Sequence, residues 1–154
     1  MDKTCGACGP NSCRHSCDGA FARRGITKVH WECWAKCNLS CNFCYRTKDP
    51  ALSHEDAERL LRIVASSGAS WCTFAGGDPS LRPDIVELLQ YARAVGLKTE
   101  VQTNAERLRH KVREEILAVN QVGLSIDGPT AAVHDNFRSC PGNYSHVLSL
   151  LAAL

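Results

Sequence analysis

The sequence lacks long apolar runs, an apolar segment at its N-terminus and any strong excess of one charge. Because its longest apolar runs span only a handful of residues, it offers no candidate for a transmembrane helix. Residues 1–5 have none of the apolar character of a secretory signal, so nothing indicates secretion. The formal net charge of +2 is too small to predict a nucleic-acid or membrane partner. A chain of 154 residues has room for one domain with a real core.

Cysteine, in contrast, is abundant. The ten cysteines stand at positions 5, 8, 13, 17, 33, 37, 41, 44, 72 and 140. That density approaches the density of small secreted proteins held together by disulfides. From about residue 50, however, the sequence reads as a regular α/β protein with only two more cysteines, and such a chain needs no disulfides. In a reducing cytoplasm, clustered thiols are more often metal ligands or catalytic groups. We therefore expect a cytoplasmic location and a chemical role for the clustered cysteines.

Apolar periodicity predicts alternating strands and helices after a cysteine-rich leader. Residues 1–25 show no apolar period and are predicted to be irregular, whereas residues 26–154 form the domain. Ser53 and Asp56 have the spacing of a helix capping box, and Gly68 ends that helix. The expected strands cover residues 27–34, 70–74, 97–102 and 122–126, and the expected helices lie between 53 and 68, between 83 and 96, over about 106–119 and from 144 onward.

This alternation predicts parallel strands joined by right-handed crossovers. Ligands of such folds gather at the carboxyl ends of the strands. The unusual loops all follow predicted strands: the cysteine loop at 36–48, the Gly-Gly loop at 76–79, the dipeptide at 103–104 and the segment at 125–127. We therefore expect these loops to lie along one rim of the sheet.

The cysteine loop places three thiols, Cys37, Cys41 and Cys44, within eight residues. Thiolates are the expected ligands of iron–sulfur clusters, and three of them would leave one iron of a [4Fe–4S] cluster open to a substrate. Structural zinc would need a fourth ligand, usually from a second Cys-x-x-Cys pair. The loop by itself favours an iron–sulfur cluster over zinc, and three incidental cysteines without a metal are the remaining alternative.

Three motifs, each after a predicted strand, carry a resemblance to a known family. The Cys-x3-Cys-x2-Cys loop, with Phe43 immediately before its last cysteine, resembles the signature loop of the radical S-adenosylmethionine (SAM) enzymes. The Gly-Gly-Asp-Pro segment at 76–79 is similar to the Gly-Gly-Glu-Pro loop of that family. Residues 124–129, followed by 134–138, resemble the fourth-strand region of its peptide-modifying and sulfatase-maturing branch. The resemblance covers about residues 27–154.

The resemblance implies a partial (β/α) barrel similar to a TIM barrel, in which Cys37, Cys41 and Cys44 each bind one iron of a [4Fe–4S] cluster. The fourth iron would be chelated by the amino and carboxylate groups of SAM. One electron, from a donor such as flavodoxin or ferredoxin, would then cleave SAM into methionine and a 5′-deoxyadenosyl radical that abstracts hydrogen from a substrate. The branch implies a peptide or protein side chain as that substrate. The sequence assigns no catalytic residue.

Residues that contact SAM are also implied, beginning with the loop Gly76-Gly77-Asp78-Pro79. Its glycines allow close approach of a ligand, and its exposed carbonyls can accept hydrogen bonds from the methionine ammonium. Asp78 replaces the glutamate of the family, and its shorter side chain is expected to reach different neighbours.

Ser125 and Arg138 are implied to bind the SAM carboxylate, which the guanidinium fork of an arginine fits. The alternative for Arg138 is a solvated side chain on a short helix.

Thr103 and Asn104 are expected either to face the ribose or to cap the third helix. Ala105 replaces the glycine that the family often has there, which predicts a different turn. Phe43 is expected either to cover the adenine or to pack the cysteine loop.

The remaining cysteines fall into two groups. Cys5, Cys8, Cys13 and Cys17 form a second cluster, suited to a zinc site or an auxiliary iron–sulfur site, with incidental leader cysteines as the alternative. The others are expected to be buried or loop residues: Cys33, Cys72 and Cys140.

Radical SAM cores resemble a barrel of about six strand–helix units, whereas this sequence supplies four strands and the opening of a further helix. A fourth strand at the end would leave an unpaired parallel edge. We therefore expect a fold truncated after about four units, which is the N-terminal piece of a longer enzyme. The alternatives are a non-catalytic zinc or iron–sulfur binding module and an inactive truncated fragment of such an enzyme.

Overall fold

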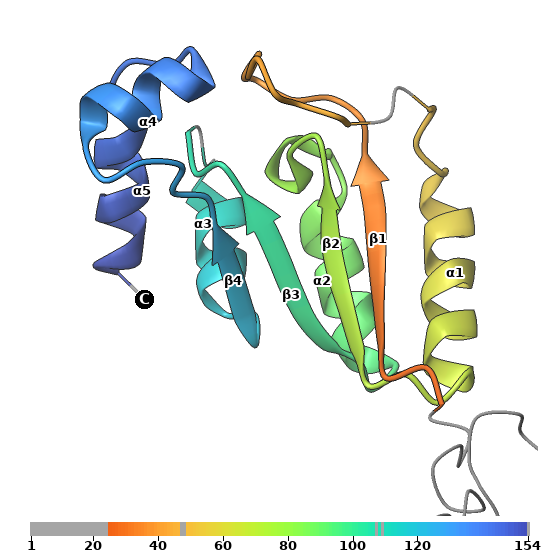
Figure 1. Cartoon of the computed structure of the whole chain (residues 1–154). Helices are drawn as coiled ribbons and strands as arrows, with labels where there is room; N and C mark the ends of the chain where they lie inside the picture. Colours follow the sequence, from red (N-terminus) through yellow and green to blue (C-terminus); the bar gives the residue numbers. More distant parts are fainter. Residues whose placement is uncertain (1–24, 47–48, 107, 109, 154) are drawn as a thin grey trace, which may run out of the picture.

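Four strands form one open, all-parallel sheet in the computed structural model, which describes residues 25–46, 49–106, 108 and 110–153. The strands are β1 (Lys28–Trp34), β2 (Trp71–Gly76), β3 (Lys98–Thr103) and β4 (Gln121–Leu124), and they lie side by side in that order. Their carboxyl ends point to the same edge of the sheet (Figure 1). The parallel α/β arrangement expected from the sequence is confirmed.

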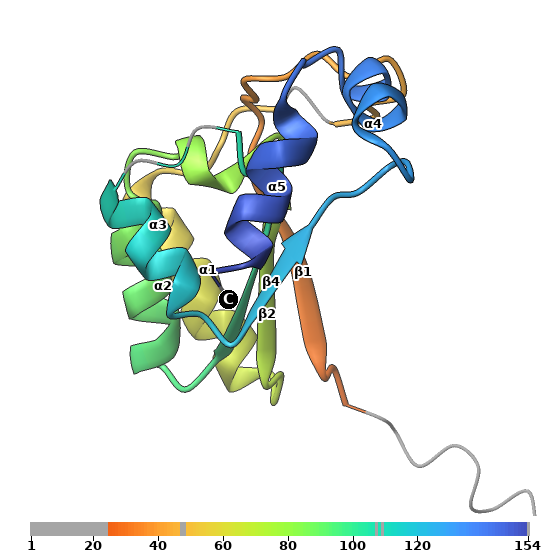
Figure 2. The same ribbon diagram turned by 90° about the vertical axis from the view of Figure 1, so that its left-hand side faces the viewer.

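Three helices cover one face of this sheet. They are α1 (His54–Ser66), α2 (Ile85–Ala94) and α3 (His110–Leu117), and Figure 2 shows them together on the same side. A short 3-10 helix, Pro79–Leu81, follows β2. After β4 come α4 (Ala131–Arg138), which lies beyond the carboxyl ends of the strands, and α5 (Asn143–Leu151). The loops that follow the strands therefore share one rim with α4.

The capping pattern predicted for α1 is confirmed. The Ser53 hydroxyl oxygen accepts a hydrogen bond from the main-chain N–H of Asp56 at 3.1 Å and donates one to the Asp56 carboxylate at 2.8 Å. Gly68, just past the helix, has a φ of +87°, which glycine adopts without a Cβ clash. The buried face of the helix consists of Ala57, Leu61 and Val64.

The second half of the chain departs from the predicted boundaries. Helix α3 is shorter than the predicted 106–119, and β4 ends at Leu124 and not at residue 126. Helix α4 enters the prediction only as a short helix that carries Arg138. It begins where the Thr130 hydroxyl accepts a hydrogen bond from the N–H of Val133. Its apolar residues Val133 and Phe137 are exposed, so it offers no buried apolar stripe for a periodicity argument to detect.

Successive strand residues point to opposite faces of the sheet, and the two faces differ in polarity. The face toward α1, α2 and α3 carries the main hydrophobic core, which includes Trp31, Phe74 and Val101. The opposite face is polar, although the interior of a closed barrel is commonly filled with branched apolar side chains. Its members include His30, Glu32, Thr73, Glu100 and Gln102. This polar face is the side of the sheet available to a ligand.

Glu100 organises the middle of the polar face. The buried carboxylate pairs with the ammonium of Lys28 and accepts hydrogen bonds from Thr73 Oγ1 at 3.0 Å and Gln102 Nε2 at 3.4 Å. Burial raises the pKa of Glu100, but these hydrogen bonds and the Lys28 charge outweigh it, so the pKa lies below its ordinary value. The resulting stabilisation is present near neutral pH and is lost as the pH falls through the lowered pKa.

Arg82 is a buried cation that ties the end of β1 to the segment before α1. Its side chain is 2% exposed. Nη1 donates to the Cys33 carbonyl at 2.8 Å, Nη2 donates to the Leu52 carbonyl at 3.1 Å, and Nε donates to the Asp84 carboxylate at 2.7 Å. The guanidinium also lies 5.7 Å from the centre of the Trp34 ring. Since Cys33 and Trp34 immediately precede the cysteine loop, Arg82 fixes the root of that loop.

Replacing this cation tests its role. We expect Arg82→Met to lower the free energy of unfolding by about 3 kcal/mol, because the buried Cys33 carbonyl, the Leu52 carbonyl and the Asp84 carboxylate lose the donor that Arg82 supplies. Chemical denaturation monitored by circular dichroism measures the change. Arg59→Met, on the exposed side of α1, is the matched control and should change stability little. Equal stability losses in the two variants would contradict the anchoring role.

Candidate functional site

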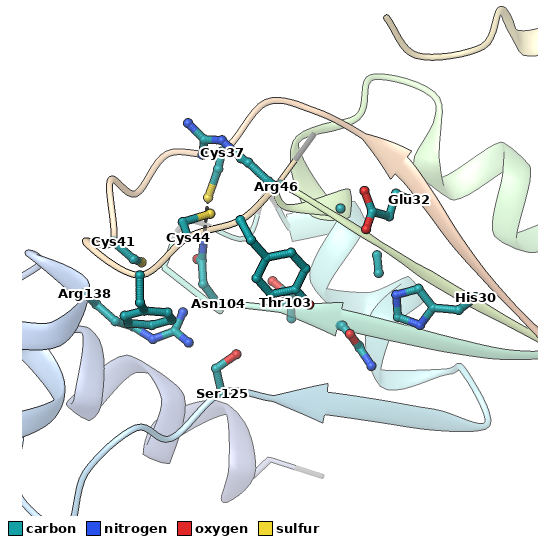
Figure 3. A pocket seen from close by; sticks show the side chains of 16 residues that line it. His30, Glu32, Cys37, Cys41, Cys44, Arg46, Thr103, Asn104, Ser125 and Arg138 are labelled. Atoms are coloured by element: carbon teal, nitrogen blue, oxygen red, sulfur yellow. Dashed lines mark hydrogen bonds between the residues drawn. The ribbon is translucent and has the colours of Figure 1, made fainter. Parts of the chain in front are cut away.

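A pocket opens at the carboxyl ends of the strands, between the cysteine loop and the loops that follow β2, β3 and β4 (Figure 3). Among the described residues, every one that the sequence predicts to bind the loop cluster or SAM lines this pocket except Asp78 and Pro79. Residues from four separate loops thus converge on one cavity, as expected for ligand sites of parallel α/β folds.

The cysteine loop leaves β1 and runs along the pocket. Its centre is anchored by the buried side chain of Leu39, whose carbonyl accepts a hydrogen bond from Arg46 Nη1 at 3.3 Å. Cys37 Sγ accepts hydrogen bonds from the Leu39 N–H and from Asn104 Nδ2, both at 3.4 Å. A turn closes the loop where the N–H of Cys44 donates to the Cys41 carbonyl at 3.2 Å. The three thiols are all free of disulfides.

This donor set fits an iron–sulfur cluster. The three thiols line one pocket, and the N–H donors to Cys37 Sγ are of the kind that tune cluster thiolates. Among the described residues, no three His, Cys, Asp or Glu side chains are grouped closely enough to hold one metal ion. The fit to a cluster therefore rests on the three thiols that share one pocket and on the donors to Cys37 Sγ.

Gly76 and Gly77 allow the loop after β2 to touch the root of the cysteine loop. A Cβ on Gly76, which has a φ of +122°, would lie 2.4 Å from the Trp34 carbonyl oxygen, and a Cβ on Gly77 would lie 2.3 Å from the Lys36 carbonyl oxygen. The Gly77 N–H donates to the Trp34 carbonyl at 2.6 Å, and the Asp78 N–H donates to the Lys36 carbonyl at 2.9 Å. The glycines are therefore required by this contact, in addition to lining the pocket.

Asp78 lies behind the pocket wall, 1% exposed. Its carboxylate accepts hydrogen bonds from the N–H groups of Ser80 and Asn104, each at 2.9 Å, and from Thr103 Oγ1 at 3.0 Å. Pro79 is also buried, at the start of the 3-10 helix. The side chain of Asp78 therefore joins the loop after β2 to the loop after β3 and does not face the cavity.

Thr103 and Asn104 end β3 and line the pocket. Asn104 Nδ2 reaches Asn38 Oδ1 at 3.0 Å in addition to the Cys37 sulfur, so its amide faces the cysteine loop. Ala105, where the family often has glycine, adopts the left-handed conformation that favours glycine, with a φ of +61°. Its N–H is held by Thr103 Oγ1 at 3.1 Å.

Ser125 and Arg138 line the opposite wall of the pocket. Arg138 is the last residue of α4, so it lies on a short helix as one of the two expectations held. Its side chain is not solvated, however, because the residue is only 8% exposed. Its Nε donates to Asp127 Oδ2 at 2.5 Å. Arg138 and Cys41 line the same pocket, and the charge of Arg138 acts against the burial that raises the pKa of Cys41. A fixed cation thus stands beside the cysteine loop.

Phe43 is half-exposed in the cysteine loop, and its ring contacts Phe137 of α4 with the ring centres 6.1 Å apart. Tyr45 also lines the pocket and is almost fully exposed. An aromatic rim therefore joins the cysteine loop to α4.

Sequence reasoning missed the part of the pocket that the strands themselves provide. His30 and Glu32 of β1, Ala75 of β2 and Gln102 of β3 line it, and so does Arg46. The sequence does contain a signal for His30 and Glu32, because polar residues alternate with apolar ones across the first predicted strand and so share one face of it.

The other cysteines have different surroundings. Cys33 and Cys72 are buried as expected, and burial raises the pKa of each thiol to about 12. Cys140 is partly exposed after α4. The possible second metal site lies outside the described residues, since it consists of Cys5, Cys8, Cys13 and Cys17.

A comparison with protein families decides the membership that these contacts suggest. The model of the radical SAM superfamily matches residues 31–154. This chain belongs to the radical SAM superfamily. The family resemblance predicted from the three motifs is thereby confirmed.

Curated radical SAM relatives share sequence with most of the chain. The "AdoMet-dependent heme synthase" of Methanosarcina barkeri (strain Fusaro / DSM 804) is 35% identical over 133 residues, which are 82% of this chain and 38% of that protein. The "Antilisterial bacteriocin subtilosin biosynthesis protein AlbA" of Bacillus subtilis (strain 168) is 26% identical, over 95% of this chain and 35% of that protein. The chain thus spans little more than a third of the length of these relatives.

A solved structure agrees on the fold. The crystal structure of Streptococcus suis SuiB bound to precursor peptide SuiA aligns with a TM-score of 0.68 at 22% identity, over 82% of this chain and 29% of that chain. The likeness confirms the expected fold class, in which four parallel strands and their helices form part of a barrel similar to a TIM barrel. Among the described residues, no helix combines the length and the apolar character needed to cross a membrane.

The difference between buried and loop thiols predicts their reactivity. In the metal-free chain at about pH 8, iodoacetamide should modify Cys33 and Cys72 at least about 100-fold more slowly than Cys44, because their pKa values leave almost no thiolate. Mass spectrometry of peptides after timed alkylation measures the rates. In denaturant the rates should converge, and fast modification of Cys33 in the folded chain would contradict its burial.

Asp78 offers a test of the joint between the two loops. Asp78→Asn should lower the free energy of unfolding by about 2 kcal/mol, because an amide N–H₂ would face buried N–H donors that need an acceptor. Thermal unfolding measures the loss. Asp49→Asn, at an exposed position before α1, is the matched control. A loss in the control as large as in Asp78→Asn would show that the buried hydrogen bonds are not its cause.

Proposed function

We propose that this chain carries the cluster- and SAM-binding part of a radical SAM enzyme. Cys37, Cys41 and Cys44 would each hold one iron of a [4Fe–4S] cluster, which leaves one iron for the amino and carboxylate groups of SAM. When bound, the cluster and SAM would together supply reductive cleavage of SAM to methionine and a 5′-deoxyadenosyl radical that abstracts hydrogen from a substrate. The observation that carries the proposal is the convergence of the three thiols, the Gly-Gly loop, Ser125 and Arg138 on one pocket.

Two groups on the wall formed by β4 and α4 would bind the SAM carboxylate. Asp127 engages Arg138 through Nε, so the Nη groups of the fork remain for a carboxylate. The Ser125 hydroxyl, at the end of β4, lines the same cavity and would add a second donor. Because Arg138 is buried and already oriented by Asp127, it would lose little conformational freedom on binding.

The opposite wall would bind the SAM ammonium and nucleoside. The Gly76 and Gly77 backbone lines the pocket without side chains, and its carbonyls are suited to the methionine ammonium. Thr103 and Asn104 line the same side, and the wall that they form, held by Asp78 and the cysteine loop, would lie beside the ribose. The ring of Phe43, supported by Phe137, would cover the adenine and exclude water from that end of the pocket. The buried side chains of Asp78 and Pro79 would support this wall from behind.

The substrate would approach from the polar face of the sheet, where His30 and Glu32 line the pocket next to the proposed SAM site. A peptide or protein side chain is the first candidate. It is supported by the relative named for subtilosin biosynthesis and by the neighbour whose structure holds a precursor peptide. A haem precursor is the second candidate, favoured by the 35% identity to the relative named as a haem synthase.

An electron donor such as flavodoxin or ferredoxin would reduce the cluster, and a cytoplasmic setting would keep the loop thiols reduced. The exposure of Cys44 and Tyr45 supports this, since it leaves the cysteine loop accessible to a protein partner. No disulfide joins any of the cysteines in the described part of the chain.

Anaerobic reconstitution of the full chain with iron and sulfide tests the proposal. We expect a cluster whose electron paramagnetic resonance signal changes when SAM is added, and release of 5′-deoxyadenosine with dithionite as reductant. Cys41→Ser should remove both, because one iron loses its thiolate. Cys140→Ser, a partly exposed cysteine outside the loop, is the matched control and should retain both.

The outcomes separate the alternatives. Zinc without iron or sulfide in a well-folded sample would favour the non-catalytic binding module. A cluster that binds SAM without cleaving it would indicate an inactive piece of such an enzyme. A cluster that fails to respond to SAM would contradict the proposed function.

A further inference from the structure

Two fully buried polar residues lie behind the pocket without lining it. His134 of α4 and Asn143 of α5 are both 0% exposed, and their side chains meet with Nε2 and Oδ1 2.9 Å apart. A buried polar pair of this kind is costly unless every group finds a partner. The partners of this pair belong to the loops that follow β3 and β4.

The directions of the hydrogen bonds assign the tautomer of His134. The main-chain N–H of Asp127 donates to Nδ1 at 3.1 Å, so Nδ1 carries no hydrogen. Nε2 must then carry the hydrogen and donate it to Asn143 Oδ1. The amide of Asn143 donates from Nδ2 to the Asn104 carbonyl at 3.0 Å and to Glu106 Oε2 at 2.9 Å. Every donor and acceptor in this chain of bonds is used consistently.

The two ends of the chain of bonds reach both walls of the pocket. At one end, Asp127 is the residue whose carboxylate holds Arg138 Nε. At the other end, Asn104 presents its side-chain amide to Cys37 Sγ. His134 and Asn143 therefore connect the arginine wall to the cysteine-loop wall, although neither side chain touches the cavity.

We propose that His134, as the neutral Nε2–H tautomer held by Asn143, is a positioning residue that sets the place of Asp127 and thereby aims Arg138 at the SAM carboxylate. The proposal rests on the proposed function, in which Arg138 binds that carboxylate. A neutral ring is needed because a hydrogen on Nδ1 would face the N–H of Asp127, donor against donor. Without the bond to Nδ1, the loop after β4 would lose the anchor that fixes the Asp127–Arg138 pair.

Two substitutions separate the acceptor role of Nδ1 from the donor role of Nε2. In His134→Asn the side-chain oxygen lies near the position of Nδ1 and keeps an acceptor for Asp127. In His134→Gln the amide nitrogen reaches the position of Nε2 and keeps the donor to Asn143, but the acceptor for Asp127 is lost. Both variants should lose stability, because each leaves one buried group unsatisfied.

SAM affinity should distinguish the variants where stability does not. On the reconstituted full chain, His134→Gln should weaken SAM binding about tenfold, whereas His134→Asn should stay within about twofold of the wild type. Isothermal titration under anaerobic conditions measures the affinity, and thermal unfolding gives the stability of the same samples. Iron and sulfide content should match the wild type in both variants. Equal SAM affinities in the two variants would overturn the proposal. They would mean that losing the bond to Asp127 weakens SAM binding no more than losing the bond to Asn143, as expected of a histidine that only stabilises the fold.

The tautomer has a direct readout. Nitrogen-15 spectra of histidine-labelled chain, with the His134 signals assigned by their loss in His134→Gln, should show a hydrogen on Nε2 and none on Nδ1. A hydrogen on Nδ1 would overturn the proposal. The proposed function fails separately, since wild-type chain that holds a cluster but binds no SAM contradicts that function and removes the basis of the inference with it.

Discussion

The site depends on one buried joint, in which Asp78 binds the loop after β2 to the loop after β3. Its carboxylate satisfies the main-chain N–H of Asn104 and the hydroxyl of Thr103, while its own N–H binds the carbonyl of Lys36 at the root of the cysteine loop. One residue thus links the loops that follow β1, β2 and β3. The close contact is possible only because Gly77 has no Cβ.

The sheet separates stability from function. Its helix side packs Phe74 and Val101 against three helices and supplies the hydrophobic core. Its other side presents polar groups, with Glu100 neutralised by Lys28 in the middle and the pocket at the carboxyl ends. Parallel strands bring both properties together, because consecutive residues point to opposite faces and every strand ends at the same rim.

All the proposed contacts to the cluster and to SAM come from the segments that follow these four strands, with Arg138 at the end of α4. The chain spans little more than a third of the length of its curated relatives, and within that share it includes the cysteine loop, the Gly-Gly loop and the Ser125–Arg138 wall. Helix α4 contributes the arginine, and the pair formed by His134 and Asn143 ties α4 and α5 to the rim. The proposed SAM site is therefore one connected structure, and the strands themselves would form its substrate side.

Much of this could be predicted from the sequence. The thiol spacing at Cys37, the capping pattern at Ser53 and the apolar periods of the core helices are local, and local patterns survive folding because they depend on neighbours in the chain. The family and the rim that carries the site followed from them. Helix α4 was hard to predict because its apolar residues are exposed. That His30 lines the pocket could be predicted only by combining the alternation along β1 with the position of β1 in the sheet.

The sequence by itself determined the parallel α/β class, the cysteine loop and the membership of the radical SAM superfamily, since motif order and periodicity are written along the chain. Only the tertiary structure decided that Asp78 joins two loops behind the pocket wall, that Arg138 is buried on Asp127 and that His134 accepts a hydrogen bond from the loop after β4. Those roles depend on hydrogen bonds between residues brought together by the crossovers, and no local pattern specifies which donor meets which acceptor.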